Sequence, residues 1–190
     1  MNAPRVRLHD VEAFERWTPF VRPFRFGAVT VEGAFQAFVR VVVDVEGHGR
    51  ATGMTAELMP PKWFDKRPER TPDETVRDLK ASLAQAVAEA NALGRADTAF
   101  GLHAELYGRQ LAWARGADVT PLSAAFGVAQ VDKAVLDGLS RALGAGFVSV
   151  LAGNAVGLDA RLTPDLDQAA IDRRLALLTP GRSIAVRHTV

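Results

Sequence analysis

The stretch that decides the fold is Phe35–Val45, which reads FQAFVRVVVDV, followed by the turn sequence EGHG at positions 46–49. β-Branched and aromatic residues dominate the stretch and mix with Arg40 and Asp44, a pattern that predicts a strand with one largely buried face. The two glycines of the turn sequence are typical of a hairpin. We therefore expect Ala51–Leu58 to return as an antiparallel strand.

The residues upstream complete a three-stranded sheet. Val6, Leu8 and Val11 predict a short first strand, so the antiparallel meander should occupy residues 5–58. Residues 18–27, TPFVRPFRFG, carry two prolines. Proline cannot donate to a ladder, so this segment is predicted to be a loop.

The second part of the chain is predicted to be helical. Thr71-Pro72-Asp73-Glu74 combines a hydroxyl cap, an early proline and a capping-box Glu, and so predicts a helix start. Apolar residues then recur at helical spacing, which predicts three helices within residues 71–144 and a fourth that begins at Thr163-Pro164. Residues 183–190, SIAVRHTV, predict one more strand. Strands followed by helices indicate an α+β domain over residues 1–160, with residues 161–190 as an appended helix and strand.

Bulk composition excludes several classes of function. The formal net charge of +1 gives no field that would attract nucleic acid or an anionic membrane. The chain has no cysteine, which excludes disulfides and thiolate chemistry and suits a reducing compartment. The N-terminus has no signal-peptide pattern, and no apolar run reaches the roughly 20 residues that span a bilayer. We expect a cytoplasmic protein.

The chain shows no motif for a complete catalytic or metal site. None of the four histidines lies three or four positions from another, so no helical zinc-binding pair is present. Asp132 and Asp137 are five apart on one predicted helix and point in different directions, so they are not a paired acid and base. No catalytic residue and no metal ligand is predicted.

Two predicted loops combine cations with aromatic rings, and they are the candidate ligand-binding segments. Guanidinium groups bind carboxylates in a bidentate fashion, and aromatic side chains can wall a ligand. An alternative stays open for the second loop, in which its two rings staple the loop onto the helices. The candidate residues are Arg22, Phe24, Arg25 and Phe26 in the first loop and Lys62, Trp63 and Phe64 in the second.

The third predicted helix and the residues after it resemble a known family. The pattern is Val128-x-x-Val131-x-x-Ala134-Val135-x-Asp137, followed by Arg141-Ala142-Leu143-Gly144 and later Leu151-Ala152-Gly153. It is similar to the segment that joins cap to barrel in the mandelate racemase and muconate lactonizing branch of the enolase superfamily. The chain departs from that pattern at Gly146, where the family usually has proline. The order of a meander followed by helices extends the resemblance over nearly the whole chain.

The resemblance implies a two-domain isomerase or lyase. In that family a (β/α) barrel binds magnesium through three carboxylates, and a lysine or histidine removes a proton alpha to a substrate carboxylate, as in racemases, cycloisomerases and dehydratases. Residues 1–160 would be the capping domain, whose two loops at 22–26 and 62–64 close over the substrate. Residues 161–190 would be a linker helix and the first strand of a barrel that this chain lacks.

Several expectations follow from the resemblance. The chain would hold no cofactor and be inactive alone, with magnesium bound only in the complete enzyme. Its partners would be the missing barrel, a small carboxylate substrate and a second copy of the chain. The alternative is a stand-alone α+β module for small-molecule binding or dimerisation.

Overall fold

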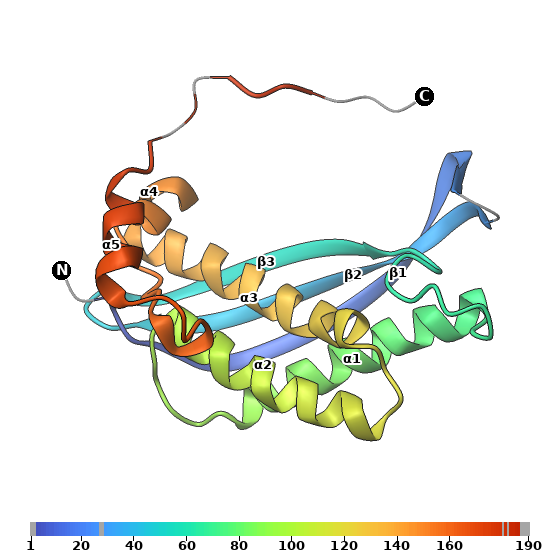
Figure 1. Ribbon diagram of the computed structural model, residues 1–190, viewed down its shortest axis with the longest axis horizontal. Helices are drawn as coiled ribbons and strands as arrows, with labels where there is room; N and C mark the ends of the chain where they lie inside the picture. Colours follow the sequence, from blue (N-terminus) through green and yellow to red (C-terminus); the bar gives the residue numbers. More distant parts are fainter. Residues whose placement is uncertain (1–2, 27–28, 180, 182, 187–190) are drawn as a thin grey trace.

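A three-stranded antiparallel sheet forms the first third of the protein (Figure 1). The computed structural model describes residues 3–26, 29–179, 181 and 183–186. The strands are β1 (Val6–Phe26), β2 (Val29–Val45) and β3 (Gly49–Met59), in the order β1-β2-β3. The predicted α+β class and meander are therefore confirmed.

The hairpin between β1 and β2 is much longer than the sequence predicted. Pro19 pairs with Gly33 and Phe24 pairs with Val31, so the expected loop at residues 18–27 is wrong over its described part. The register shifts between Pro19 and Phe24, and this irregularity absorbs the segment that contains Pro23. β1 is an edge strand, where a missing N–H leaves no gap in the interior of a sheet. The result is a hairpin tip that projects beyond the helices (Figure 1).

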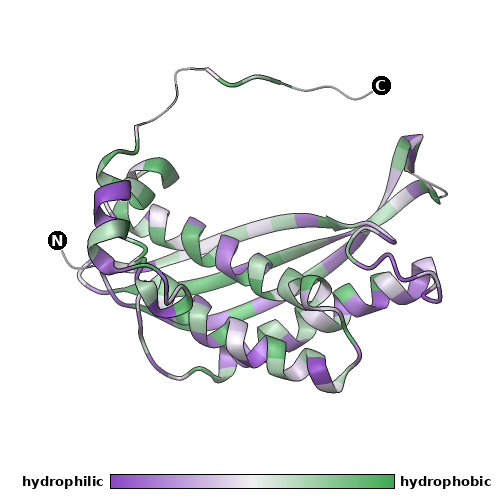
Figure 2. Cartoon of the chain, in the orientation of Figure 1, coloured by the Kyte–Doolittle hydropathy of each residue, from purple (hydrophilic) through white to green (hydrophobic). Residues whose placement is uncertain are grey.

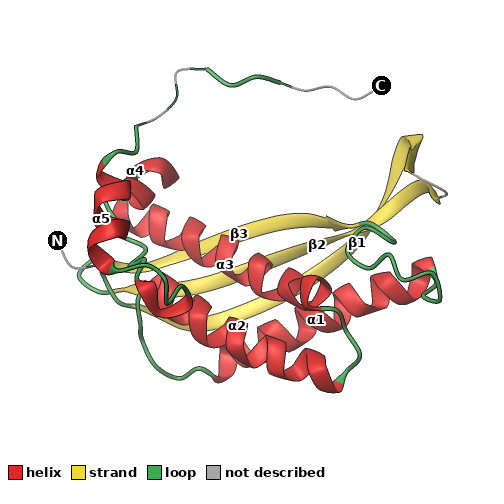
Figure 3. Ribbon diagram, viewed as in Figure 1, coloured by secondary structure: helices red, strands yellow, loops and turns green. Residues whose placement is uncertain are grey.

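Three long helices lie on one side of the sheet (Figure 3). They are α1 (Pro72–Ala92), α2 (Ala99–Gly116) and α3 (Pro121–Leu143). Each begins after a threonine whose side chain accepts a backbone N–H, and at α1 the reciprocal bond from Glu74 completes the predicted capping box. Contacts place α1 against β1, α3 against β2 and β3, and α2 against α1 and α3.

The core lies between the sheet and the helices α1 and α3. Alternate residues of β2 point toward the helices, as expected for a strand with one buried face. Hydrophobic and hydrophilic residues alternate along the helices (Figure 2), as expected for helices with one buried side. Buried members of this core include Val39, Val41, Val43, Val45, Leu79, Leu83, Val128, Val131, Val135 and Leu139.

Gly53 allows β3 and α3 to approach closely. A Cβ at Gly53 would lie 2.0 Å from the carbonyl oxygen of Ala134 and 2.3 Å from the amide nitrogen of Gly138. No side chain fits in that space, so glycine is required for the contact between strand and helix.

The C-terminal part differs most from the expectation. It contains α4 (Phe147–Ala152), a short 3-10 helix (Ala160–Leu162) and α5 (Gln168–Ala176). A fourth helix was predicted to begin at Thr163-Pro164, but α5 begins later, after Asp167, whose side chain accepts the Ala170 N–H and caps the helix. None of the described helices is long and apolar enough to cross a membrane.

The predicted last strand is not formed where the structure describes it. Ser183–Val186 has no ladder, and Ile184 and Val186 are 88% and 86% exposed. A strand requires pairing partners, and none of the described residues pairs with this segment. Residues 187–190, the rest of the predicted strand, lie outside the described residues.

Candidate functional site

The two candidate ligand-binding segments lie together at the hairpin-tip end of the sheet. Phe24, near the end of β1, lines the same pocket as Trp63 and Phe64, which follow β3. The pocket has a volume of about 430 Å³, and Phe20 and Val31 also contribute to it. Residues about forty positions apart thus share one largely apolar surface, which we call the tip pocket.

The three predicted aromatic residues of the tip pocket are held differently. Phe24 and Trp63 are 51% and 52% exposed. Phe64 is half-buried, and its ring packs edge-on against Phe126 with centroids 5.4 Å apart. Phe64 therefore acts as the staple that the sequence left as an alternative, whereas Trp63 presents much of its indole ring at the surface.

Lys62 closes the loop instead of facing the tip pocket. Its φ of 59° lies in the left-handed region, which is uncommon for a residue other than glycine. Its backbone N–H donates to Thr75 Oγ1 at 2.9 Å, and its ammonium group donates to the carbonyl oxygens of Arg67 at 2.5 Å and Arg70 at 3.0 Å. These bonds hold the ammonium group within its own loop.

A buried carboxylate that the sequence did not single out also fixes this loop. Asp65 is only 2% exposed and accepts hydrogen bonds from the backbone and the guanidinium group of Arg67, both at 2.9 Å. Burial opposes ionisation, but the hydrogen bonds and charge of Arg67 prevail and lower the pKa of Asp65 below its ordinary value. Arg67 also reaches Asp118, so the loop is tied to the segment before α3.

The predicted cations of the hairpin tip are exposed. Arg22 lies in the irregular part of β1, and Arg25 pairs with Thr30 in the ladder. Neither guanidinium group forms an ion pair with a described residue. The side chain of Phe26 lies outside the described part. The structure thus brings Phe24, Trp63 and Phe64 together, with the two arginines on the same hairpin.

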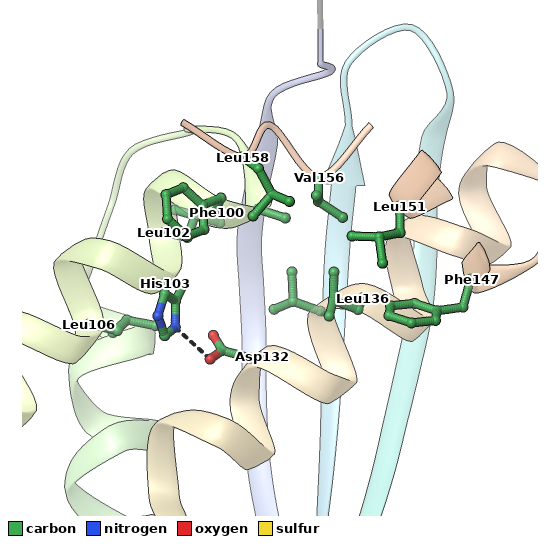
Figure 4. A pocket seen from close by; sticks show the side chains of 12 residues that line it. Phe100, Leu102, His103, Leu106, Asp132, Leu136, Phe147, Leu151, Val156 and Leu158 are labelled. Carbon is green, nitrogen blue, oxygen red and sulfur yellow. Dashed lines mark hydrogen bonds and ion pairs between the residues drawn. The ribbon is translucent and has the colours of Figure 1, made fainter. Parts of the chain in front are cut away.

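A second pocket lies between α2, α3 and α4 (Figure 4). His103 Nδ1 and Asp132 Oδ2 are 2.6 Å apart there. The two residues are on different helices and 29 positions apart, so their spacing gave no signal of the pair. The only sequence signal is the position of Asp132 beside Val131, within the apolar stripe of α3. The prediction that Asp132 and Asp137 are unpaired fits the geometry, because Asp137 instead accepts from Arg141 at 2.8 Å.

The His103–Asp132 pair has perturbed ionisation. The hydrogen bond from His103 to Asp132 raises the pKa of the imidazole above its ordinary value, against the opposing effect of burial. Burial raises the pKa of Asp132, and the bond from His103 opposes that shift. The protonated imidazole is therefore favoured in the folded chain.

A magnesium site does not fit the described residues of this chain. Nowhere among them do three or more histidine or acidic side chains cluster so that they could hold a metal ion. Magnesium needs a near-octahedral set of oxygen ligands. No chemical step is therefore assigned to a metal held by these residues.

The chain is similar to a solved structure but to no family model and no curated protein. No protein-family model matches the sequence, and no curated protein matches it. A crystal structure of an enolase from Bradyrhizobium, complexed with magnesium and mandelic acid, matches with a TM-score of 0.49 and 18% sequence identity. The match covers 77% of this chain and 35% of that enolase, so the chain spans about a third of its length.

Proposed function

We propose that this chain is the N-terminal, substrate-capping part of an enolase-superfamily enzyme. The observation that carries the proposal is the tip pocket. Phe24, from one expected capping loop, and Trp63 and Phe64, from the other, share its wall. Such convergence is what a cap needs in order to close over one substrate with two segments.

The candidate residues at the hairpin-tip end of the sheet have distinct roles in this proposal. The half-exposed rings of Phe24 and Trp63 cover the apolar part of the substrate and exclude water from it. Phe64 anchors the second loop through Phe126 and so fixes the position of Trp63. Arg22 and Arg25 do not line the pocket, but they lie on the same hairpin as Phe24 and supply guanidinium groups that can bind a carboxylate. Glu57 does line the pocket, and its charge is paired with Lys133 at 3.0 Å. The proposed substrate is therefore a small carboxylate with an apolar substituent.

The reaction belongs to the barrel that completes such an enzyme. The proposed class is magnesium-dependent removal of a proton alpha to a carboxylate, in a racemase, cycloisomerase or dehydratase. Magnesium would stabilise the developing negative charge when bound to that barrel. The present chain contributes binding, orientation and exclusion of water, and is inactive alone. A cysteine-free chain of this kind suits the cytoplasm.

The proposal is tested with Trp63→Ala in the complete enzyme. Exchange of the substrate α-proton in deuterated water reports the reaction, and thermal unfolding reports the fold. Removing an exposed ring of the tip pocket should raise KM while the melting temperature changes little. The matched control is Phe14→Ala, because Phe14 is as exposed as Trp63 but does not line the pocket.

Two results would count against the proposal. The first is that Trp63→Ala mainly lowers the melting temperature and leaves KM as in the parent enzyme. Equal KM changes for Trp63→Ala and Phe14→Ala would show that the tip pocket has no special part in substrate handling.

A further inference from the structure

The pocket between α2, α3 and α4 is lined almost entirely by apolar side chains. Ten of its twelve lining residues are apolar, and the other two are His103 and Asp132 (Figure 4). Phe147 and Leu151 of α4 line it, and α4 lies at the opposite end of the sheet from the hairpin tip (Figure 1). This pocket, which we call the helix pocket, is built wholly from described residues and is separate from the tip pocket.

The polar pair on its wall is held in a fixed orientation. The imidazole ring of His103 stacks on Tyr107, with centroids 5.6 Å apart and an interplanar angle of 17°. Its Nδ1–H donates to Asp132 Oδ2. The second carboxylate oxygen, Oδ1, has no hydrogen-bond partner among the described residues. An ionised carboxylate accepts several hydrogen bonds, so Asp132 retains an acceptor for a ligand.

The size of the helix pocket selects a single ring. Its volume is about 150 Å³. Dry apolar cavities of roughly 150 Å³ in proteins bind benzene. An apolar ligand that fills a pocket of this size gains packing contacts as well as burial of its apolar surface.

The charge on its wall selects a neutral molecule. An anion would meet the Asp132 carboxylate, and any unpaired charge is costly to bury among apolar side chains. The hydrogen bond from His103 already compensates the Asp132 carboxylate, which removes the need for a cationic ligand. A neutral hydroxyl group satisfies the remaining acceptor without adding charge.

We propose that the helix pocket binds a small neutral monocyclic molecule that carries one hydroxyl group, with this hydroxyl donating to Asp132 Oδ1. The ring occupies the space between Leu136, Leu151 and Val156. The helix pocket shares no lining residue with the tip pocket, so this inference does not rest on the proposed capping function.

The test is a titration of the full chain with phenol, followed by NMR of the side-chain methyl groups. Saturable shifts should appear at Leu136, Leu151 and Val156. Toluene, which lacks the hydroxyl group, should bind roughly tenfold more weakly, since a hydrogen bond to a charged group is lost. Benzoate, which is anionic, should cause no saturable shift in these methyl groups.

Variants that fill the helix pocket with a larger side chain, and a matched control outside it, test the location of the site. Leu151→Trp places a larger ring in the cavity and should abolish phenol binding. Leu122→Trp is the control, because Leu122 is exposed and does not line the pocket. Leu136→Phe is a second filling variant for the case that Leu151→Trp does not fold, as judged from its amide spectrum.

Three results would overturn the inference. The first is the absence of saturable phenol shifts up to the solubility limit, which would leave His103–Asp132 as a tie between two helices. The second is unchanged phenol binding in a folded filling variant. The third is binding of toluene or benzoate at least as tight as that of phenol.

Discussion

Substitution of Gly53 by alanine tests the packing of the sheet against α3. The added methyl group would lie 2.0 Å from the Ala134 carbonyl oxygen and 2.3 Å from the Gly138 amide nitrogen. Both neighbours are backbone atoms, so no side chain can rotate away. Helix and strand must separate by roughly 1.4 Å to restore an ordinary contact of 3.4 Å.

The cost of that separation follows from the core it opens. Overpacking costs about 1–3 kcal/mol by itself, and separation also loosens buried valines on β2 and α3. We expect Gly53→Ala to lower the free energy of unfolding by about 3 kcal/mol. For a chain of this length, that corresponds to a fall in melting temperature of roughly 6–12 °C.

Gly108→Ala is the matched control for this experiment. Gly108 lies within α2, and a Cβ there would meet no atom within 4 Å. Alanine is favoured over glycine inside a helix by about 1 kcal/mol, so this variant should melt about 2–4 °C higher than the parent. Both melts can be followed by circular dichroism or calorimetry. A melting temperature of Gly53→Ala that lies within about 1 °C of the parent value would refute the close packing of β3 and α3.

Three further predictions concern ionisation, association and metal binding. Asp132→Asn should lower the NMR titration midpoint of His103, while Asp137→Asn should leave it unchanged. The pKa of His103 is raised in the folded chain, so its stabilising effect is complete below a pH of about 6.5 and is lost as the pH rises through the folded pKa. The difference in free energy of unfolding between the parent and Asp132→Asn should therefore shrink at higher pH. The chain should self-associate through exposed apolar residues near its end, and the double variant Ile184→Ser with Val186→Ser should do so less in sedimentation experiments; unchanged association would assign the contact elsewhere. Calorimetry of the isolated chain should detect no tight magnesium binding, and a stoichiometric heat of binding would contradict this.

The sheet core and the long helices were predictable because their signals are local. The turn sequence at 46–49 and the apolar run of β2 specify a hairpin without reference to the rest of the chain. Threonine caps specify where α1 and α3 begin. The prolines of the hairpin tip misled the prediction, because their tolerance depends on whether a strand lies at a sheet edge, which is a property of the whole sheet.

The pockets were predictable only in part. Aromatic residues beside cations indicated Phe24, Trp63 and Phe64, and the fold brings these three rings to one pocket. The His103–Asp132 pair could not be predicted, since it depends on how two helices pack. Lys62 was expected beside the ligand because of its neighbours, but carbonyl oxygens within its loop hold its ammonium group.

The most direct test of the capping function is to read the gene beyond the codon for Val190. A capping domain requires a barrel, and a complete (β/α) barrel takes about 250 residues. The proposal predicts an open reading frame that continues with alternating strand and helix patterns, lysine bases and spaced Asp and Glu residues at strand ends. A stop codon directly after Val190 would contradict it, and would favour a stand-alone α+β module that binds small molecules or forms dimers.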